Sequence, residues 1–425
     1  DPMFHESVIG ADPHNLDAWF CEGKMLRRIL TDGSSDSDIS LIEGVMGFYD
    51  GVCGKASSHA VSLDVDCPVV LVVDCKGMST SIGAVISGFL YNYALNYIVE
   101  RFLVLSGFLN FRTPNNIVGF IFNRLSPQLV DEIKALCNEA GTEFLGYFPN
   151  SPECALESRK LGLVTPEGVC ELKQKTQLLA GKAEQYINIS RMLELSESHQ
   201  LTDLAEMPAK HFHGVRIAVA RDAAFSFIYR DNIRFLEHLG AEIIYFSPIN
   251  DKKTPDGING LMLFGGYPEL FAEKLSENRS MMQSIKEKIK SGLPIIAECG
   301  GFMYLHDALA IDDKHTYPMV GVIPGKAFPT AKLQRFGYVR LYAKENNLLC
   351  NKNEELLAHE FHYWDSENCG SGFKAVKESS GKQWDCVHAK ENMYAGFPHL
   401  YFYANLSAAL RFVEACHKYG GNNDI

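Results

Sequence analysis

The stretch "PIIAECGGFMYL", residues 294–305, joins a short apolar run to a helical pattern through one cysteine and two glycines. The apolar, β-branched start predicts a buried strand, and the residues after the glycines predict a helix that begins at once. Such an abrupt change from strand to helix pushes one side chain out of the backbone, which here is Cys299. The pattern predicts an α/β fold and makes Cys299 a candidate nucleophile, with a buried structural thiol as the alternative.

Short apolar runs alternate with helical patterns along the rest of the chain, which is typical of βαβ units around a parallel sheet. In the first half, the predicted strands are 39–44, 68–75, 117–124 and 143–149. In the second half, they are 215–222, 241–248, 260–266 and 293–301. Because no internal repeat relates the two halves, we expect two different parallel-sheet α/β domains.

The length of 425 residues also favours more than one domain. Between about residues 174 and 212 the strand pattern gives way to a polar helical stretch that is rich in Glu and Lys. This stretch is predicted to be a helical linker. The expected division is therefore a first domain over 1–173, a linker over 174–212 and a second domain over 213–425.

The composition excludes several classes of protein. A hydrophobic fraction of 46% and a charged fraction of 22% are typical of a globular protein, and the net charge of −12 disfavours binding to nucleic acid or to an anionic membrane. No apolar run reaches the roughly 18 residues that span a bilayer, and no basic-then-apolar leader opens the chain. The twelve cysteines are scattered, without a C-x-x-C pair. We expect a cytoplasmic protein.

Polar side chains follow several predicted strands of the first half. Glu43, Asp50 and Asp74 stand at strand ends, where the ligands of open α/β sheets gather, and carboxylates there could hold Mg²⁺ against phosphates. Capping a helix or facing solvent is the alternative. Asn123 also ends a strand, where its amide could bind a nucleobase edge or simply cap a turn. Since the chain contains no G-x-x-x-x-G-K-[ST] phosphate loop, nucleotide binding requires a segment that precedes Asp1.

The second half offers the other groups that a cysteine nucleophile needs. The Gly300 N–H could donate to an oxyanion, and Gly265 and Gly266 in "FGGYPE" would let a second backbone N–H approach the substrate. A base is also required. Among fourteen histidines, the candidates are His359 and His362 in "AHEFHYW" and His399 in "PHLYFYAN". Spacing does not choose among the three.

The whole sequence resembles the cobyrinate a,c-diamide synthase family, whose members fuse a dethiobiotin-synthetase-like ATP domain to a class I-like glutamine amidotransferase domain. The resemblance rests on blocks that occur in the family's order, among them "NLDAWF", "IEGVMGFYDG", "VARDAAFSFIYRDNIRF", "FGGYPELFAEKLSEN", "IIAECGGFMYL" and "HEFHYW". It implies a P-loop-type synthetase domain followed by a flavodoxin-like amidotransferase domain. It also implies Mg²⁺ and ATP as cofactor and co-substrate.

For the second domain, the resemblance makes Cys299 the nucleophile that attacks the glutamine amide and His399 the group that raises its nucleophilicity. His399 stands at the first position of the family's closing Y-x-H-x-H-F pattern, and Tyr401 replaces the second histidine. If the second position were the catalytic one, the assignment of His399 would be wrong. The resemblance assigns no chemical role to the block at 222–232.

For the first domain, the resemblance places Asp1, Glu43 and Asp50 around Mg²⁺, ATP and the substrate carboxylate, and Asn123 at the adenine edge. Lys160 stands where the family has a histidine in "RHLGL", so any role of that histidine does not transfer. The family's glycine-rich phosphate loop precedes "DPMFH", and this chain begins after it. We therefore expect a first domain without its first strand and loop, which would bind ATP poorly.

The expected function is the ATP- and glutamine-dependent amidation of the a and c carboxylates of cobyrinate in cobalamin biosynthesis. Amidation of Ni-sirohydrochlorin or of hydrogenobyrinate is an alternative, because the shared blocks do not distinguish these macrocycles. A more distant alternative is a non-catalytic α/β binding protein. The expected partners are small molecules, namely L-glutamine, ATP and a tetrapyrrole carboxylate. A homodimer is compatible with the sequence, which does not determine the oligomeric state.

Overall fold

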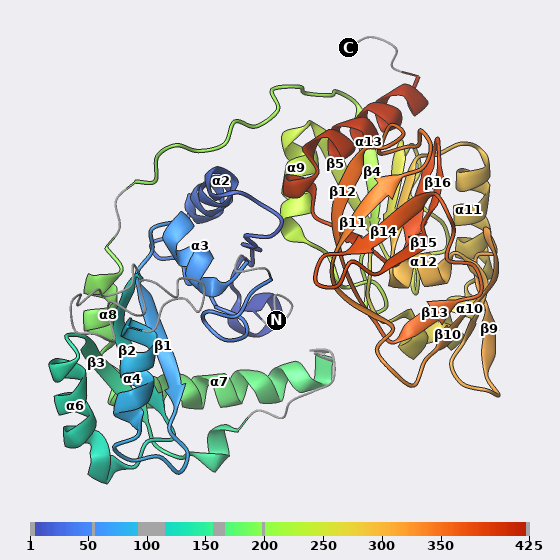
Figure 1. Ribbon diagram of the computed structural model, residues 1–425. Coiled ribbons are helices and arrows are strands. Elements are labelled where there is room, and N and C mark those ends of the chain that lie inside the picture. The colour runs from blue at the N-terminus through green and yellow to red at the C-terminus, as the bar shows by residue number, and fades with distance from the viewer. Residues whose placement is uncertain (1–4, 53–55, 92–114, 156–165, 198–199, 422–425) are drawn as a thin grey trace. The chain divides into compact units, whose positions relative to one another are not determined.

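The computed structural model describes residues 5–52, 56–91, 115–155, 166–197 and 200–421 (Figure 1). The chain forms two compact units. Unit 1 comprises Asp1–Ala18 and Leu26–Leu204, and unit 2 comprises Trp19–Met25 and Ala205–Ile425. The division at Leu204 falls inside the stretch 174–212, which is helical as far as Leu195. Both units are of the α/β class, as predicted.

Unit 1 is built on a parallel sheet, whose described strands run in the order β1 (Val69–Asp74), β2 (Ile117–Asn123), β3 (Glu143–Phe148). These strands confirm three of the predicted runs. The longer described helices are α2 (Gly23–Ser34), whose residues from Leu26 on belong to this unit, α3 (Ser58–Asp64), α4 (Ile82–Tyr91), α6 (Val130–Glu139), α7 (Pro166–Tyr186) and α8 (Ile189–Leu195). Ile82, Ile86 and Leu90 recur every four residues along α4 and pack with Phe120 and Phe122 of β2 in one core.

The prediction of a strand over 39–44 is wrong. The segment has no regular structure, and its apolar side chains Ile39 and Leu41 are 53% and 90% exposed. A strand is stable when its backbone groups pair with a neighbouring strand, and no described strand pairs with 39–44. The apolar residues of 39–44 therefore suggested a buried strand, but the segment is exposed.

Unit 2 contains a sheet with the described order β16-β17-β7-β6-β4-β5. The strands are β4 (Val215–Ala220), β5 (Ala241–Phe246), β6 (Gly260–Leu263), β7 (Ile295–Glu298), β16 (His388–Lys390) and β17 (Met393–Gly396). All neighbouring pairs are parallel except β16 with β17. Counted along the chain, the parallel strands follow the order 2-1-3-4-5, which is the flavodoxin-like order. The predicted fold of the second domain is confirmed.

Helices cover both faces of this sheet (Figure 1). A β-carbon on Gly260 of β6 would meet Phe412 and Cys416, so α13 (Leu406–Tyr419) packs on the face to which Gly260 points. The next residue, Leu261, points to the opposite face and packs in one core with Ile285 of α11 (Arg279–Lys290). Three shorter helices are α9 (Arg230–His238), α10 (Ala272–Glu277) and α12 (Gly300–Tyr304).

Two further sheets of unit 2 were not predicted. A sheet of order β13-β10-β8-β9 is formed by β8 (His306–Ala310), β9 (Thr316–Pro318), β10 (Ile323–Pro329) and β13 (Trp364–Ser366). An antiparallel sheet of order β15-β14-β11-β12-β18 is formed by β11 (Arg335–Ala343), β12 (Glu355–His362), β14 (Phe373–Lys377), β15 (Gln383–Cys386) and β18 (His399–Leu400). The pairing of β12 with β18 sets His399 opposite His359.

Candidate active site

Cys299 is the single residue between strand β7 and helix α12. Its N–H donates to Gly396 O on the neighbouring strand at 2.8 Å, and its C=O accepts the first helical hydrogen bond from Met303 N at 2.9 Å. Because Cys299 bonds to the sheet through its N–H and to the helix through its C=O, its backbone adopts φ 46° and ψ −104°. A non-glycine residue there is strained by about 1–3 kcal/mol, and such strain is concentrated at functional sites. The geometry is that of a nucleophile elbow.

The glycines that follow Cys299 are required by close packing. A β-carbon on Gly301 would lie 2.0 Å from Leu263 O, and one on Gly300 would lie 2.9 Å from Pro268 Cδ and 3.0 Å from Gly266 N. Alanine at 301 would therefore force the turn away from β6. The two glycines let the elbow sit directly against the loop that follows β6.

That loop brings Gly266 next to Gly300. Gly266 adopts φ +156°, and a β-carbon on it would lie 2.2 Å from Ala224 O. In the described structure neither the Gly266 N–H nor the Gly300 N–H donates a backbone hydrogen bond. Two N–H groups without backbone acceptors beside a strained cysteine are candidate donors to an oxyanion.

His399 lies against Cys299 in a buried position with 5% of its surface exposed. Burial by itself would lower the pKa of His399, but the Cys299 thiol and the Glu298 carboxylate act against it and raise the pKa to about 10. Glu298 Oε2 lies 3.4 Å from His399 Nδ1. Since Nδ1 faces the carboxylate, Nε2 is the nitrogen left available to the thiol.

Gly265 packs closely against both His399 and Cys299. A β-carbon on Gly265 would lie 2.7 Å from His399 Cε1 and 3.6 Å from Cys299 Cβ. The Phe227 ring stands 4.8 Å from the His399 ring, and Phe227 is 43% exposed, so this part of the site borders solvent. Cys299 is itself partly exposed, so a small amide group could reach the sulfur.

The other two candidate bases have different surroundings. Burial, and then the neighbouring charge of His399, lower the pKa of His359 to about 4, so His359 is neutral near pH 7. His362 Nε2 contacts Glu360 Oε2 at 3.0 Å, and its Nδ1 lies 2.6 Å from Trp364 O. Among the three candidates, His399 is the one that the structure brings to Cys299.

The acids of unit 1 each contact a different residue rather than one another. Glu43 Oε2 pairs with His5 Nε2 at 3.0 Å, and Asp50 Oδ2 accepts from Gly47 N at 3.1 Å within its own turn. Asp74 accepts from Arg124 Nε at 2.7 Å. Over the described residues, no group of three or more His, Cys, Asp or Glu side chains could hold a metal ion. Glu43 and Asp50, the described members of the expected Mg²⁺ set, therefore do not form such a group.

The other positions predicted in unit 1 divide between described and undescribed residues. Asn123 is exposed at the carboxyl end of β2, where it pairs in register with Asp74 of β1. This edge of a parallel sheet is the one at which ligands bind. Asp1 and Lys160 lie outside the described residues.

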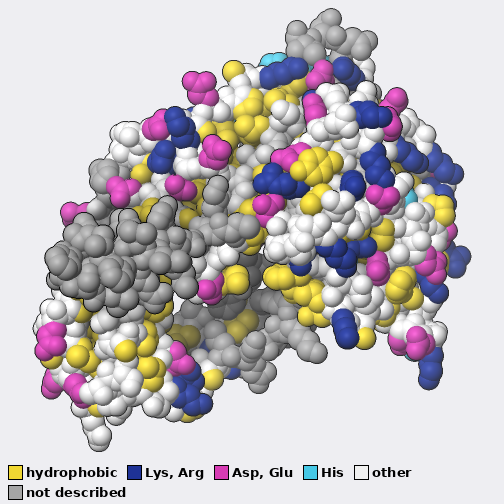
Figure 2. Space-filling view, in the orientation of Figure 1, with side chains coloured by type: hydrophobic (Ala, Val, Ile, Leu, Met, Phe, Trp, Pro, Cys, Tyr) yellow, Lys and Arg dark blue, Asp and Glu magenta, His cyan; other side chains and the backbone are white. Residues whose placement is uncertain are grey.

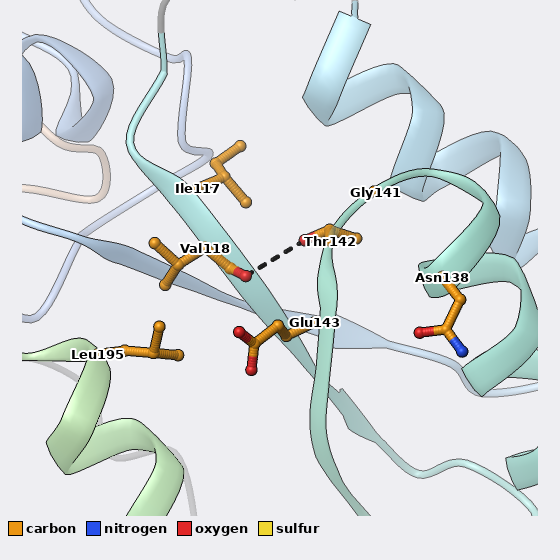
Figure 3. Close-up of a pocket in the computed structure, with 7 residues that line it drawn as sticks. All are labelled: Ile117, Val118, Asn138, Gly141, Thr142, Glu143 and Leu195. Carbon is orange, nitrogen blue, oxygen red and sulfur yellow. Dashed lines mark hydrogen bonds between the residues drawn. The ribbon is translucent and has the colours of Figure 1, made fainter.

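A hollow on the surface of unit 1 lies at the opposite edge of the same sheet (Figure 3). It is lined by Ile117 and Glu143, the first residues of β2 and β3, and by Thr142, whose Oγ1 donates to Val118 O at 3.4 Å. Glu143 is bound there by Arg191 at 2.7 Å. Because the hollow is at the amino ends of the strands, it is not the expected nucleotide site.

Known proteins match the chain over almost its whole length. Residues 216–406 match the family described as the CobB/CobQ-like glutamine amidotransferase domain. The cobyrinate a,c-diamide synthase of Caldanaerobacter subterraneus subsp. tengcongensis is 33% identical over 99% of this chain and 90% of its own. Those of Listeria innocua and Thermoplasma volcanium are 35% and 33% identical, over 98% and 100% of this chain and 90% of each relative. The chain belongs to the cobyrinate a,c-diamide synthase family. As a member of this family it is an enzyme, a glutamine-dependent carbon–nitrogen ligase.

The structure gives a role to the block at 222–232, for which the sequence had suggested none. Asn232 Nδ2 donates to Leu400 O at 2.8 Å, and Asn232 Oδ1 accepts from Phe402 N at 2.7 Å. Asp231 Oδ2 accepts from the Tyr401 hydroxyl at 3.1 Å. In this member of the diamide synthase family, the block therefore fixes the segment that carries His399.

Glu298 is a buried side chain of the site that the sequence pattern did not single out. It is 1% exposed, although it ends an otherwise apolar strand. The available signal was the charge itself, because a carboxylate at the end of "PIIAE" breaks an apolar run immediately before the candidate nucleophile. Its contact with His399 depends on a strand a hundred residues further along the chain.

The surface is consistent with a family that acts on small molecules. Basic and acidic side chains are interspersed over the visible face rather than collected into a basic field (Figure 2). The net charge is −12. Among the helices that the structure describes, none combines the length and the apolarity needed to cross a bilayer.

Proposed function

We propose that this chain catalyses the ATP-dependent amidation of the a and c carboxylates of cobyrinate, with glutamine as the nitrogen donor. The observation that supports this most is the match to cobyrinate a,c-diamide synthases at 33–35% identity across nearly the whole chain. The contact of Cys299 with His399 at a strained elbow is the second support.

In the proposed glutaminase half-reaction, His399 Nε2 takes the proton of the Cys299 thiol, and the sulfur attacks the γ-carbonyl carbon of glutamine. The N–H groups of Gly266 and Gly300 donate to the oxyanion. The C–N bond then breaks, His399 returns its proton to the leaving nitrogen, and ammonia and a γ-glutamyl thioester result. Water, deprotonated by His399, hydrolyses the thioester to glutamate and frees the thiol.

In the proposed synthetase half-reaction, a peripheral carboxylate of the macrocycle attacks the γ-phosphate of ATP, and ammonia then displaces phosphate from the acyl phosphate to leave the amide. Asn123, at the carboxyl edge of the unit 1 sheet, is the residue we assign to the adenine. Mg²⁺, with Asp1, Glu43 and Asp50 around it, remains a hypothesis from the family resemblance. No step above depends on it. We also propose a cytoplasmic enzyme, with a homodimer as the assembly to be tested by sedimentation.

The choice of macrocycle is tested by supplying the purified enzyme with cobyrinate, Ni-sirohydrochlorin or hydrogenobyrinate, together with ATP and glutamine, and identifying the products by mass. We expect two amide groups to be added to cobyrinate. Turnover of Ni-sirohydrochlorin or hydrogenobyrinate without turnover of cobyrinate would refute our assignment.

The role of Cys299 is tested by Cys299→Ser with each nitrogen source. We expect glutamine-dependent synthesis to be lost while synthesis from free ammonia continues, because only the ammonia supply depends on the thiol. Loss of both activities in a folded variant would contradict the assignment. Cys369→Ser, which changes another partly exposed thiol of unit 2, is the matched control and should retain both activities.

A further inference from the structure

A buried carboxylate beside the nucleophile is not used by the mechanism above. Glu298 Oε1 accepts a hydrogen bond from Leu400 N at 3.1 Å, and Oε2 lies 3.4 Å from His399 Nδ1. In the described part of the chain, no lysine or arginine forms an ion pair with Glu298. A carboxylate buried to this degree is costly unless hydrogen bonds or an opposite charge compensate it. The charge available to compensate it is that of protonated His399.

The other groups that the structure describes around Glu298 and His399 carry no positive charge that could compensate the carboxylate. Tyr394 of β17 is fully buried near Glu298, and its hydroxyl donates to Pro398 O at 3.3 Å. His359 of β12 stands opposite His399 and is held neutral by burial. The Cys299 thiol also contacts the imidazole. Glu298 is thus the acidic group that contacts the Nδ1 side of His399.

A carboxylate cannot reach the imidazole from the position two residues after His399, because that residue is Tyr401. Its hydroxyl donates to Asp231 at 3.1 Å instead. A general base next to a nucleophile works best when a third group fixes its orientation and tautomer. In this chain, Glu298 is placed to do so from the position before the nucleophile.

We propose that Glu298 is a positioning residue that orients His399 through Nδ1 and stabilises its protonated form, which in turn favours the Cys299 thiolate. The proposal rests on the proposed glutaminase function. The 3.4 Å separation is longer than an ideal hydrogen bond, and a small rotation of the imidazole closes it. Catalytic hydrogen bonds often shorten in this way when substrate binds.

The choice of variants distinguishes the proposed positioning role of Glu298 from a purely structural one. Glu298→Gln keeps the side-chain volume and an acceptor for the Leu400 N–H but removes the charge. Glu360→Gln is the matched control, because Glu360 is also fully buried in unit 2 and contacts a different histidine, His362, at 3.0 Å. His399→Gln defines the complete loss of the base. Thermal unfolding confirms that each variant is folded.

The experiment measures alkylation of Cys299 by iodoacetamide, followed by mass spectrometry of its peptide, between about pH 5.5 and pH 9.5. At about pH 6.5 we expect Glu298→Gln to be alkylated about tenfold more slowly than the wild type, approaching His399→Gln. At the alkaline end the rates should converge, because the thiolate then forms without help. Glu360→Gln should follow the wild type throughout. With glutamine, Glu298→Gln should lower kcat about a hundredfold and change KM little.

Wild-type alkylation at every pH in Glu298→Gln would overturn the proposal and leave Glu298 a structural role. Equal slowing in Glu298→Gln and Glu360→Gln at every pH would overturn it as well, because it would indicate general loosening. The measurement needs no glutamine, ATP or macrocycle. If His399→Gln behaved as the wild type, the Cys299–His399 pair of the proposed function would fail, and that outcome differs from a failure of Glu298 alone.

Discussion

The hydroxyl of Tyr401 donates a hydrogen bond to the carboxylate of Asp231 at 3.1 Å, and both side chains are buried. Tyr401 is the residue two positions after His399, where the family's closing pattern has its second histidine. Its ring packs 5.6 Å from Phe20 and 5.5 Å from Tyr229. These contacts make Tyr401 an anchor between the His399 segment and α9.

Tyr401→Phe should therefore keep glutaminase activity and lose stability. Removing the hydroxyl deprives a buried carboxylate of one donor, which costs about 1–3 kcal/mol in the free energy of unfolding. Urea unfolding and ammonia release from glutamine measure the two effects. His399→Gln should lose the glutaminase activity that Tyr401→Phe keeps. A folded but inactive Tyr401→Phe protein would move the catalytic role to the second position of the pattern.

Gly265→Ala should strongly lower glutaminase activity, because the added methyl group would lie 2.7 Å from His399 Cε1, close to Cys299. The imidazole must then move away from the thiol, or the substrate amide is excluded. A displacement of about 1 Å in such a site costs about a hundredfold in rate. The rate of glutamate formation measures the effect.

Gly181→Ala is the control for Gly265→Ala. Gly181 lies in helix α7, and a β-carbon there would have nothing within 4 Å. Alanine in a helix is favoured over glycine by roughly 0.5–1 kcal/mol, so this variant should be as stable as the wild type or slightly more so, with unchanged activity. Full activity in Gly265→Ala would show that the close approach of residue 265 to His399 is not needed for the reaction.

The elbow at Cys299 could be predicted because its signal is local. A strand, one residue and a helix follow one another within "PIIAECGGFMYL", and the two glycines are those that the close packing requires. The parallel strands were predicted for the same reason. Short apolar β-branched runs with turn residues between them carry their own signal.

The partner of Cys299 could not be predicted from spacing, because it depends on pairing between distant segments. His399 belongs to a two-residue strand, β18, which is held by β12 about forty residues earlier and by Asn232 of α9. Nothing local distinguishes His399 from His359 or His362. The resemblance to a family supplied that choice.

For the acids of unit 1, the sequence indicated where a side chain lies but not which residue it contacts. The position of Asp74 at a strand end was predicted correctly. The sequence did not indicate that Arg124, in the turn after β2, would form a hydrogen bond with it. Glu43 follows a segment that is not a strand at all. An acidic residue at the end of a strand therefore indicates an edge of the sheet. Whether its carboxylate is available to a ligand depends on which side chain already contacts it.

Glu269 gives the last prediction, which concerns pH. Glu269 follows the loop that carries Gly265 and Gly266, and burial raises its pKa to about 7, against the smaller effect of a backbone hydrogen bond. The folded pKa therefore lies above the ordinary carboxyl value of about 4.3. Between those two values the folded protein keeps a proton that the unfolded chain has lost. Stability is then fully present below about pH 4.3 and falls as pH rises towards 7.

Glu269→Gln removes this dependence, because the amide stays neutral. Urea unfolding of the wild type and of Glu269→Gln, at about pH 5 and about pH 8, measures the difference. We expect the variant to gain on the wild type as pH rises, by up to about 3 kcal/mol. Glu273→Gln, an exposed position of α10, removes the same charge nearby. An equal gain in Glu273→Gln would assign the effect to net charge, and no gain in Glu269→Gln would show that its carboxyl ionises freely in the fold.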